Sequence, residues 1–323
     1  MRCQFCGHEN PERAIYCETC GAILGAQTRH DDPRLREIIR RIRDNIGQRK
    51  TSDRILPTYL IWVVIIVSIL TFVVAFAPIF FILSSDPWDF SYRDSIFDLI
   101  SIIEISLSVV AEVLLAVLAY FLVKRHNEHS MREGNLKQNI GDLTRTTADD
   151  PKRQEAFWRE TRQLGFYMGT GTRTRNPLLW ALLLLLPTFA SLASWGLFTG
   201  SLGGFNLAFG IAGFGSILSL SVIGLVANMY MFYFLGREFK DHEDLWSGFA
   251  SSARGLLTRL GFPDGRPHIV RLTQPRSFVL YLVLAIFVPF FIYYWWYVIL
   301  KDPNEHYRNQ WEFEDRLLEV LGS

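Results

Sequence analysis

Five long apolar segments alternate with charged stretches along this chain of 323 residues. They cover about 56–83, 95–123, 177–200, 205–235 and 278–300. Each exceeds the roughly 20 residues that a helix needs to cross about 30 Å of hydrocarbon. The pattern therefore predicts an all-α polytopic membrane protein with about five to six membrane helices, and makes the lipid bilayer its first partner.

The apolar segments divide the chain into membrane and connecting parts. The short acidic loop after the first segment and the turn "TGSLGGFN" after the third each favour a hairpin. Pro187 lies inside the third segment and is expected to kink or break that helix. The expected parts are a first membrane hairpin at 56–123, a cytosolic helical linker at 124–176, a second membrane hairpin at 177–235, a cytosolic linker at 236–277, a last membrane segment at 278–300 and a polar C-terminal helix at 301–323.

Lysine and arginine counts predict the orientation. Nine lie in 29–55, eleven in 124–176 and seven in 236–277, whereas the loop "SSDPWDFSYRD" has one arginine and three aspartates. Basic loops stay on the cytoplasmic side of a membrane. The sequence thus predicts a multi-pass protein of the cell membrane with a cytoplasmic N-terminus.

The last apolar segment makes the side of the C-terminus ambiguous. Five simple crossings would leave the C-terminus outside. A re-entrant hairpin broken at Pro289 would return it to the cytosol, although 23 residues are short for one. The sequence weakly favours a cytosolic tail.

Residues 33–50 form an amphipathic basic pattern ahead of the first membrane segment. The apolar residues on one helical face are Leu35, Ile38, Ile39, Ile42 and Ile46, and arginines occupy most of the remainder. Such a helix suits an anionic membrane surface, which is the interpretation favoured here. The alternative is a solvated helix that packs on another domain.

Four cysteines, all before residue 21, form two Cys-x-x-Cys pairs: Cys3, Cys6, Cys17 and Cys20. Four thiolates suit tetrahedral Zn²⁺, and a reducing cytosol keeps them available. Disulfides or a redox site are the competing explanations, but no strand–helix context supports a redox site. We expect a structural zinc ribbon over 1–25, closed to substrate because the protein supplies all four ligands.

Gly7, Asn10 and Gly21 complete the pattern C-x-x-C-G-x-x-N…C-x-x-C-G around the cysteines. This stretch resembles the short prokaryotic zinc-ribbon family. The segment from Arg276 to Gln310, with its aromatic cluster, looks like an uncharacterised prokaryotic membrane-domain family found beside zinc ribbons, which implies no known activity.

Three apolar segments leave the membrane with similar sequences: "YFLVKRHNEH", "YFLGREFKDH" and "YVILKDPNEH". Each ends in an acid and a histidine, namely Glu128 with His129, Asp241 with His242 and Glu305 with His306. We interpret them as an internal repeat. If the repeats met around an axis, the six side chains could bind a metal. The favoured interpretation is that acids suit the first turn of the following helices and that histidine is an interfacial residue.

The second apolar segment has an acidic face that includes Asp98, Glu104 and Glu112. Carboxylates inside a span are costly and often mark an ion or proton path. Polar contacts between helices, or a helix that lies along the interface, explain the pattern equally well.

No hydrolase, nucleotide-binding or strong nucleic-acid motif accompanies these features. The sequence therefore favours a non-enzymatic membrane protein whose cytosolic ribbon and helices act as an interaction or regulatory platform for a cytosolic protein. The alternative is an ion or proton channel or transporter that uses the acidic face of the second segment. A metal-dependent membrane enzyme using the repeated histidines is a weaker third possibility.

Overall fold

The computed structural model is almost entirely helical over the residues it describes, which confirms the all-α class. These are 2–3, 6–11, 14, 17–19, 33–84, 90–147, 164–167, 174–200, 207–259, 274, 276–288 and 290–322. Within these ranges the only strand-like pairing is an isolated antiparallel bridge between Arg2 and Glu9.

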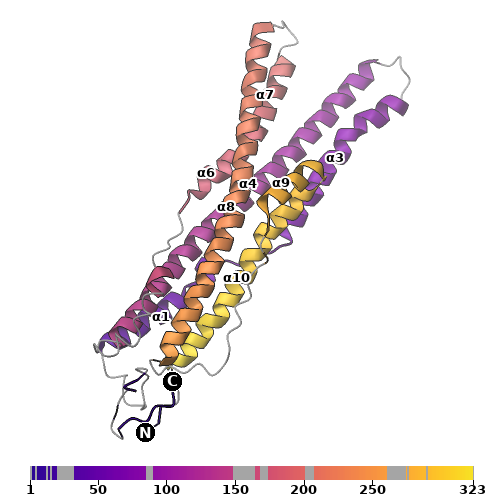
Figure 1. Cartoon of the computed structure of the whole chain (residues 1–323). Helices are drawn as coiled ribbons and strands as arrows, with labels where there is room; N and C mark the ends of the chain where they lie inside the picture. Colours follow the sequence, from indigo (N-terminus) through magenta and orange to yellow (C-terminus); the bar gives the residue numbers. More distant parts are fainter. Residues whose placement is uncertain are drawn as a thin grey trace.

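Two pairs of helices form the apolar half of the molecule. The helix α3 (Leu60–Ser84) packs along the first part of α4 (Phe90–Thr147). The helix α7 (Leu186–Gly200) packs along the first part of α8 (Leu207–Arg259), and the short α6 (Pro177–Leu184) packs on α4 (Figure 1). The break between α6 and α7 lies next to Pro187, as expected for a proline inside a helix.

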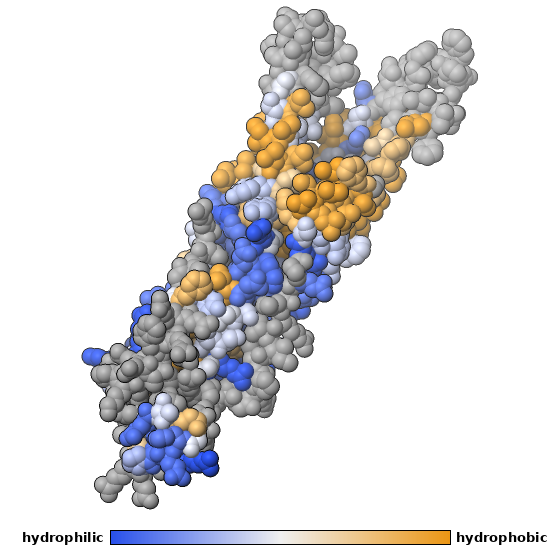
Figure 2. Space-filling view, in the orientation of Figure 1, coloured by the Kyte–Doolittle hydropathy of each residue, from blue (hydrophilic) through white to orange (hydrophobic). Residues whose placement is uncertain are grey.

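Three helices of the described chain are long and apolar enough to cross a membrane. They lie within Leu60–Ala77, Asp98–Thr146 and Leu218–Leu257, while Pro177–Ala193 and Phe278–Phe287 are shorter apolar helices. Large apolar side chains point outward there, and the exposed fractions of Val73 and Val226 are 60% and 61%. Such a surface suits lipid rather than water, and Figure 2 shows it as an apolar belt over one half of the molecule.

The segment 278–300 folds back on itself. The helix α9 (Phe278–Phe287) ends shortly before α10 (Phe291–Gly322) begins, and Phe290 between them has a positive φ of 64°. The Phe278 and Trp295 rings lie 5.5 Å apart, and Arg276 forms an ion pair with Asp302 (Nε–Oδ2 2.9 Å). The two ends of the segment therefore lie side by side, as expected for a re-entrant hairpin. Pro289, the expected breakpoint, lies outside the described residues.

The polar half of the molecule is a second helical bundle. The later parts of α4, α8 and α10 continue into it without interruption, and α1 (Pro33–Gly47) and the short α2 (Arg49–Ser52) complete it. Both chain ends lie at its far end (Figure 1). The helices thus connect an apolar half to a bundle with a core of its own.

The position of α1 corrects the membrane-surface interpretation of 33–50. Its five apolar residues are all buried, with Ile42 at 0% exposure, and share one cluster with side chains of α4, α8 and α10. Examples are Ile140, Phe249 and Leu317. The structure therefore supports the alternative, a helix that packs on another part of the protein. No apolar face of α1 is left for lipid. Amphipathic periodicity shows that a face is covered, not what covers it.

Gly224 on α8 lies close to Pro187 on α7 in the apolar half. A Cβ atom there would lie 2.5 Å from Cδ of Pro187. We expect Gly224→Ala to lower the free energy of unfolding by about 1–3 kcal/mol, because the overlap forces the helices apart. Gly215→Ala is the matched control, since no atom lies within 4 Å of its added Cβ. Equal thermal stability of the two variants in detergent would contradict this packing.

Candidate metal centres

The described cysteines converge at the N-terminal end. Ligand atoms of Cys3, Cys6 and Cys17 all lie within 4.8 Å of one another, which allows them to hold a metal ion. The Sγ atoms of Cys6 and Cys17 are 3.4 Å apart, well beyond the roughly 2.05 Å of a disulfide. This distance is near the edge of about 3.8 Å expected for a tetrahedron with Zn–S bonds of about 2.3 Å. Cys20, the fourth predicted ligand, lies outside the described residues.

Local backbone geometry holds this group together. Gly7 has a φ of 74°, the left-handed conformation expected after the first Cys-x-x-Cys pair. The Asn10 side chain is buried, accepts a hydrogen bond from the backbone N–H of Glu18 (2.9 Å) and donates to the Sγ of Cys17 (3.5 Å). Asn10 therefore orients the Sγ of Cys17 as well as the turn that carries it.

A layer of buried charged and polar side chains separates two apolar cores in the helical part. On α4, the apolar-half core ends at Val123 and the polar-half core begins at Leu136. On α8 and α10 the corresponding gaps run from Leu235 to Trp246 and from Leu300 to Phe313. We call the buried groups between the cores the polar layer; they are Asp53, Arg125, His126, His129, Arg132, Glu133, His242, Glu243, Asp302, Asn304, His306, Gln310 and Glu314.

The three histidines of the repeated exit sequences meet in the polar layer. His129 lies on α4, His242 on α8 and His306 on α10, with exposed fractions of 1%, 6% and 2%. Nε2 of His129 is 3.2 Å from Nε2 of His242. The ring centroid of His306 lies 5.3 Å from that of each of the other two. All three are buried and face one another, so their rings are not directed outward from the helices.

Glu133 supplies the carboxylate of this histidine cluster. Its Oε2 lies 3.3 Å from Nε2 of His129 and 2.9 Å from Nε2 of His242. Its other oxygen pairs with Nζ of Lys137 at 2.7 Å. Ligand atoms of His129, Glu133, His242 and His306 all lie within 4.8 Å of one another, so this group could also hold a metal ion.

The three acids of the repeat do not take part in the cluster. Glu128 lies 4.0 Å from Nε of Arg54, Glu305 pairs with Lys301, and Asp241 is exposed. The acid that precedes each histidine lies on a different side of the helix from the histidine itself. Glu133, four residues after His129 and so on the same helical face, is the position that helical periodicity could have identified.

Asp53 orients His129 from the opposite side of the ring. Its Oδ1 lies 3.0 Å from Nδ1 of His129, and Trp311 donates Nε1–H to its Oδ2 at 2.9 Å. Arg132 also donates to both carboxylate oxygens. Burial would raise the pKa of Asp53, but the charges and hydrogen bonds of His129 and Arg132 outweigh it and hold that pKa well below its usual value. An ionised Asp53 favours the proton on Nδ1 of His129, which directs the Nε2 lone pair at the cluster.

Arg125 closes the apolar side of the polar layer. Pro303 inside α10 has no N–H, so the carbonyl of Ile299 lacks its helical partner. Arg125 donates to the carbonyl oxygens of Ile299 (3.3 Å) and Leu300 (3.1 Å) and to Oδ1 of Asn304 (2.7 Å). The arginine thereby offsets the break that the proline makes in the helix ladder.

The acidic face of α4 does not form a comparable site. Asp98 is exposed, and Glu104 and Glu112 are half-buried. In the part of the chain that the structure describes, no hydrogen bond or ion pair joins any two of these three side chains.

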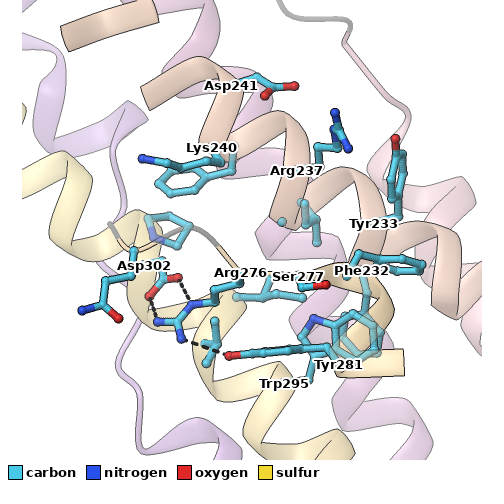
Figure 3. A pocket seen from close by; sticks show the side chains of 18 of the residues that line it. Phe232, Tyr233, Arg237, Lys240, Asp241, Arg276, Ser277, Tyr281, Trp295 and Asp302 are labelled. Carbon is cyan, nitrogen blue, oxygen red and sulfur yellow. Dashed lines mark hydrogen bonds and ion pairs between the residues drawn. The ribbon is translucent and has the colours of Figure 1, made fainter. Parts of the chain in front are cut away.

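A cavity of about 390 Å³ lies where α8, α9 and α10 meet at the edge of the apolar half (Figure 3). Aromatic side chains, including Phe232 and Trp295, form one wall. Arg276 is held there by Asp302 and by the Tyr281 hydroxyl, to which it donates at 3.0 Å. Three cations, Arg237, Lys240 and Arg276, and two acids, Asp241 and Asp302, line the cavity, and Arg276 is paired with Asp302.

Comparisons of the chain with protein-family models, with curated proteins and with solved structures gave no significant match. The fold and these sites define a class only: an α-helical protein with three described helices that are long and apolar enough to cross a membrane, and with two clusters of side chains that could hold a metal ion, one of cysteines and one of histidines with a carboxylate.

Proposed function

We propose that the protein is a non-enzymatic, multi-pass protein of the cell membrane whose cytosolic helical bundle presents a zinc-binding head as an interaction or regulatory platform. The observation that carries the proposal is the burial of α1. Because the apolar face of α1 belongs to the same core as side chains of α4, α8 and α10, the helix that follows the head is an integral part of the bundle.

The metal in the head is Zn²⁺ with a structural role. Thiolate ligands and their tetrahedral spacing favour it over harder cations, and four cysteines leave no open coordination position. The excess of lysine and arginine in 29–55, 124–176 and 236–277 supports a cytosolic location for the head and the bundle. There the thiols stay reduced, and a cytosolic protein partner can reach the surface of the head.

The test is partner recovery after cross-linking in intact cells and extraction in detergent. We expect Cys17→Ser with Cys20→Ser to lose specific partners while the protein stays in the membrane at the wild-type level. His8→Ala is the control, because His8 is an exposed neighbour of the cysteines and is not expected to be a ligand. Unchanged recovery of partners by the double variant would count against a platform role of the head.

The alternative is an ion or proton path through Asp98, Glu104 and Glu112, which no hydrogen bond or ion pair joins in the part of the chain that the structure describes. A comparison of proteoliposome flux between the wild type and Glu104→Gln with Glu112→Gln is its direct test. Flux that falls in the double variant would revive a transport function; equal flux would end it.

A further inference from the structure

We propose that His129, Glu133, His242 and His306 bind one divalent transition-metal ion, which ties α4, α8 and α10 together inside the polar layer. This site is separate from the cysteine head and does not depend on the proposed platform role.

The spacing of the donor atoms suits a shared ion. Ligands at about 2.0–2.1 Å from a tetrahedral ion lie about 3.3 Å from one another. Nε2 of His129, Nε2 of His242 and Oε2 of Glu133 are 2.9–3.3 Å apart in all three pairs. His306 on the third helix belongs to the same group, because one ligand atom from each of the four residues lies within 4.8 Å of the others.

The hydrogen bonding of these atoms also points to a shared ion. Oε2 of Glu133 has short contacts with two ring nitrogens, but it has no partner with hydrogen-bond geometry among the described residues. Nε2 of His306 has none either. Buried polar atoms are normally satisfied, and two such atoms in one cluster of four side chains call for an explanation. A cation that accepts their lone pairs provides one.

The surrounding residues match the second shell of a metal site. Asp53 faces Nδ1 of His129, as in the carboxylate–histidine–metal arrangement that orients ligand rings. Lys137 holds the other oxygen of Glu133. Glu243 lies 3.9 Å from Nδ1 of His306, on the side of that ring away from its Nε2. Each of these three ligands therefore has a charged group behind it.

The donor set selects the class of ion. Three imidazole nitrogens and one carboxylate suit Zn²⁺ and neighbouring divalent ions such as Co²⁺, whereas Ca²⁺ and Mg²⁺ prefer oxygen and Cu(I) prefers sulfur. Four protein ligands fill a tetrahedral shell, which is typical of structural ions. Because the ligands come from three helices, the ion fixes their relative positions at the level where the two cores meet.

Co²⁺ titration of the purified full chain tests the site. The starting protein has Cys3, Cys6, Cys17 and Cys20 replaced by Ser, which removes the sulfur ligands. We expect it to bind one Co²⁺ per chain, with visible d–d absorption, no sulfur charge-transfer band, and only nitrogen and oxygen neighbours in X-ray absorption. Failure to bind Co²⁺ would overturn the proposal.

Ligand variants in the same background assign the ion to the cluster. We expect His242→Ala and His306→Ala to weaken Co²⁺ binding at least about 100-fold, more than the loss of an outer-shell partner. His126→Ala is the matched control, because His126 is a buried histidine on α4 outside the ligand group and should leave binding unchanged. Equal affinities of all three variants would overturn the assignment.

A second measurement covers variants that fail to fold. Ligands that bind only the folded state raise the unfolding temperature. Co²⁺ should therefore raise the thermal midpoint of the serine-substituted protein and of its His126→Ala variant. A midpoint that does not move in either protein with saturating Co²⁺ would contradict the site without reference to any ligand variant.

Discussion

Replacement of Arg132 by Met is expected to lower the free energy of unfolding by about 3–5 kcal/mol, the usual cost of removing one partner of a buried ion pair. Arg132 is 3% exposed and donates Nη1–H to Oε1 of Glu314 at 2.7 Å and Nε–H to Oδ1 of Asp53 at 3.1 Å. Without it, two buried carboxylates on different elements lose their shared cation. Burial already raises the pKa of Glu314, and Arg132 only partly offsets this.

Chemical unfolding in mixed micelles measures this effect. Arg40→Met is the control, because Arg40 pairs with Glu37 on the surface with its side chain 68% exposed. Exposed pairs of this kind contribute about 0–1 kcal/mol. If both variants unfolded at the same denaturant concentration, Arg132 would not hold the polar layer together.

Removal of zinc from the head is expected to unfold the head and leave the helices intact. Zinc binding contributes about 10–16 kcal/mol to the folding of comparable small metal domains, which cannot build a sufficient apolar core. A strong chelator, or Cys17→Ser with Cys20→Ser, should therefore make residues 1–20 sensitive to protease and their remaining thiols reactive.

Limited proteolysis with far-UV circular dichroism separates the head from the bundle. The helical signal should stay at the wild-type level, and His8→Ala should keep a protected head. A head that resists protease equally with and without zinc would show that the metal does not hold it.

Local pattern alone was enough to predict long apolar helices and a cluster of cysteines that could hold a metal ion. Hydrophobicity over about 20 residues reports a property that each segment has by itself, and the described structure places long apolar helices at Leu60–Ala77 and Leu218–Leu257. The positive φ of Gly7 and the inward position of Asn10 likewise follow from the short-range spacing of the Cys-x-x-Cys turn. The zinc ion itself and the internal repeat stay predictions.

The partners of each element could not be predicted in the same way. The periodicity of α1 identified its buried face, but bundle helices and lipid both cover such a face. Similarly, the alignment of three histidines placed them at equivalent heights without showing that their helices converge. Asp53 carried no sequence signal, because its contacts to His129 and Trp311 join residues 76 and 258 positions apart.

We propose that both ends of the chain lie on the cytosolic side of the membrane, on one bundle. Labelling of single cysteines with an impermeant thiol reagent tests it most directly. Arg36→Cys on α1 and Glu319→Cys on α10 are exposed positions, used in a chain whose four native cysteines are Ser. Asp86→Cys in the acidic loop serves as the opposite-side control. We predict that sealed right-side-out vesicles label only Asp86→Cys until they are permeabilised; labelling of Arg36→Cys or Glu319→Cys in sealed vesicles would contradict the account.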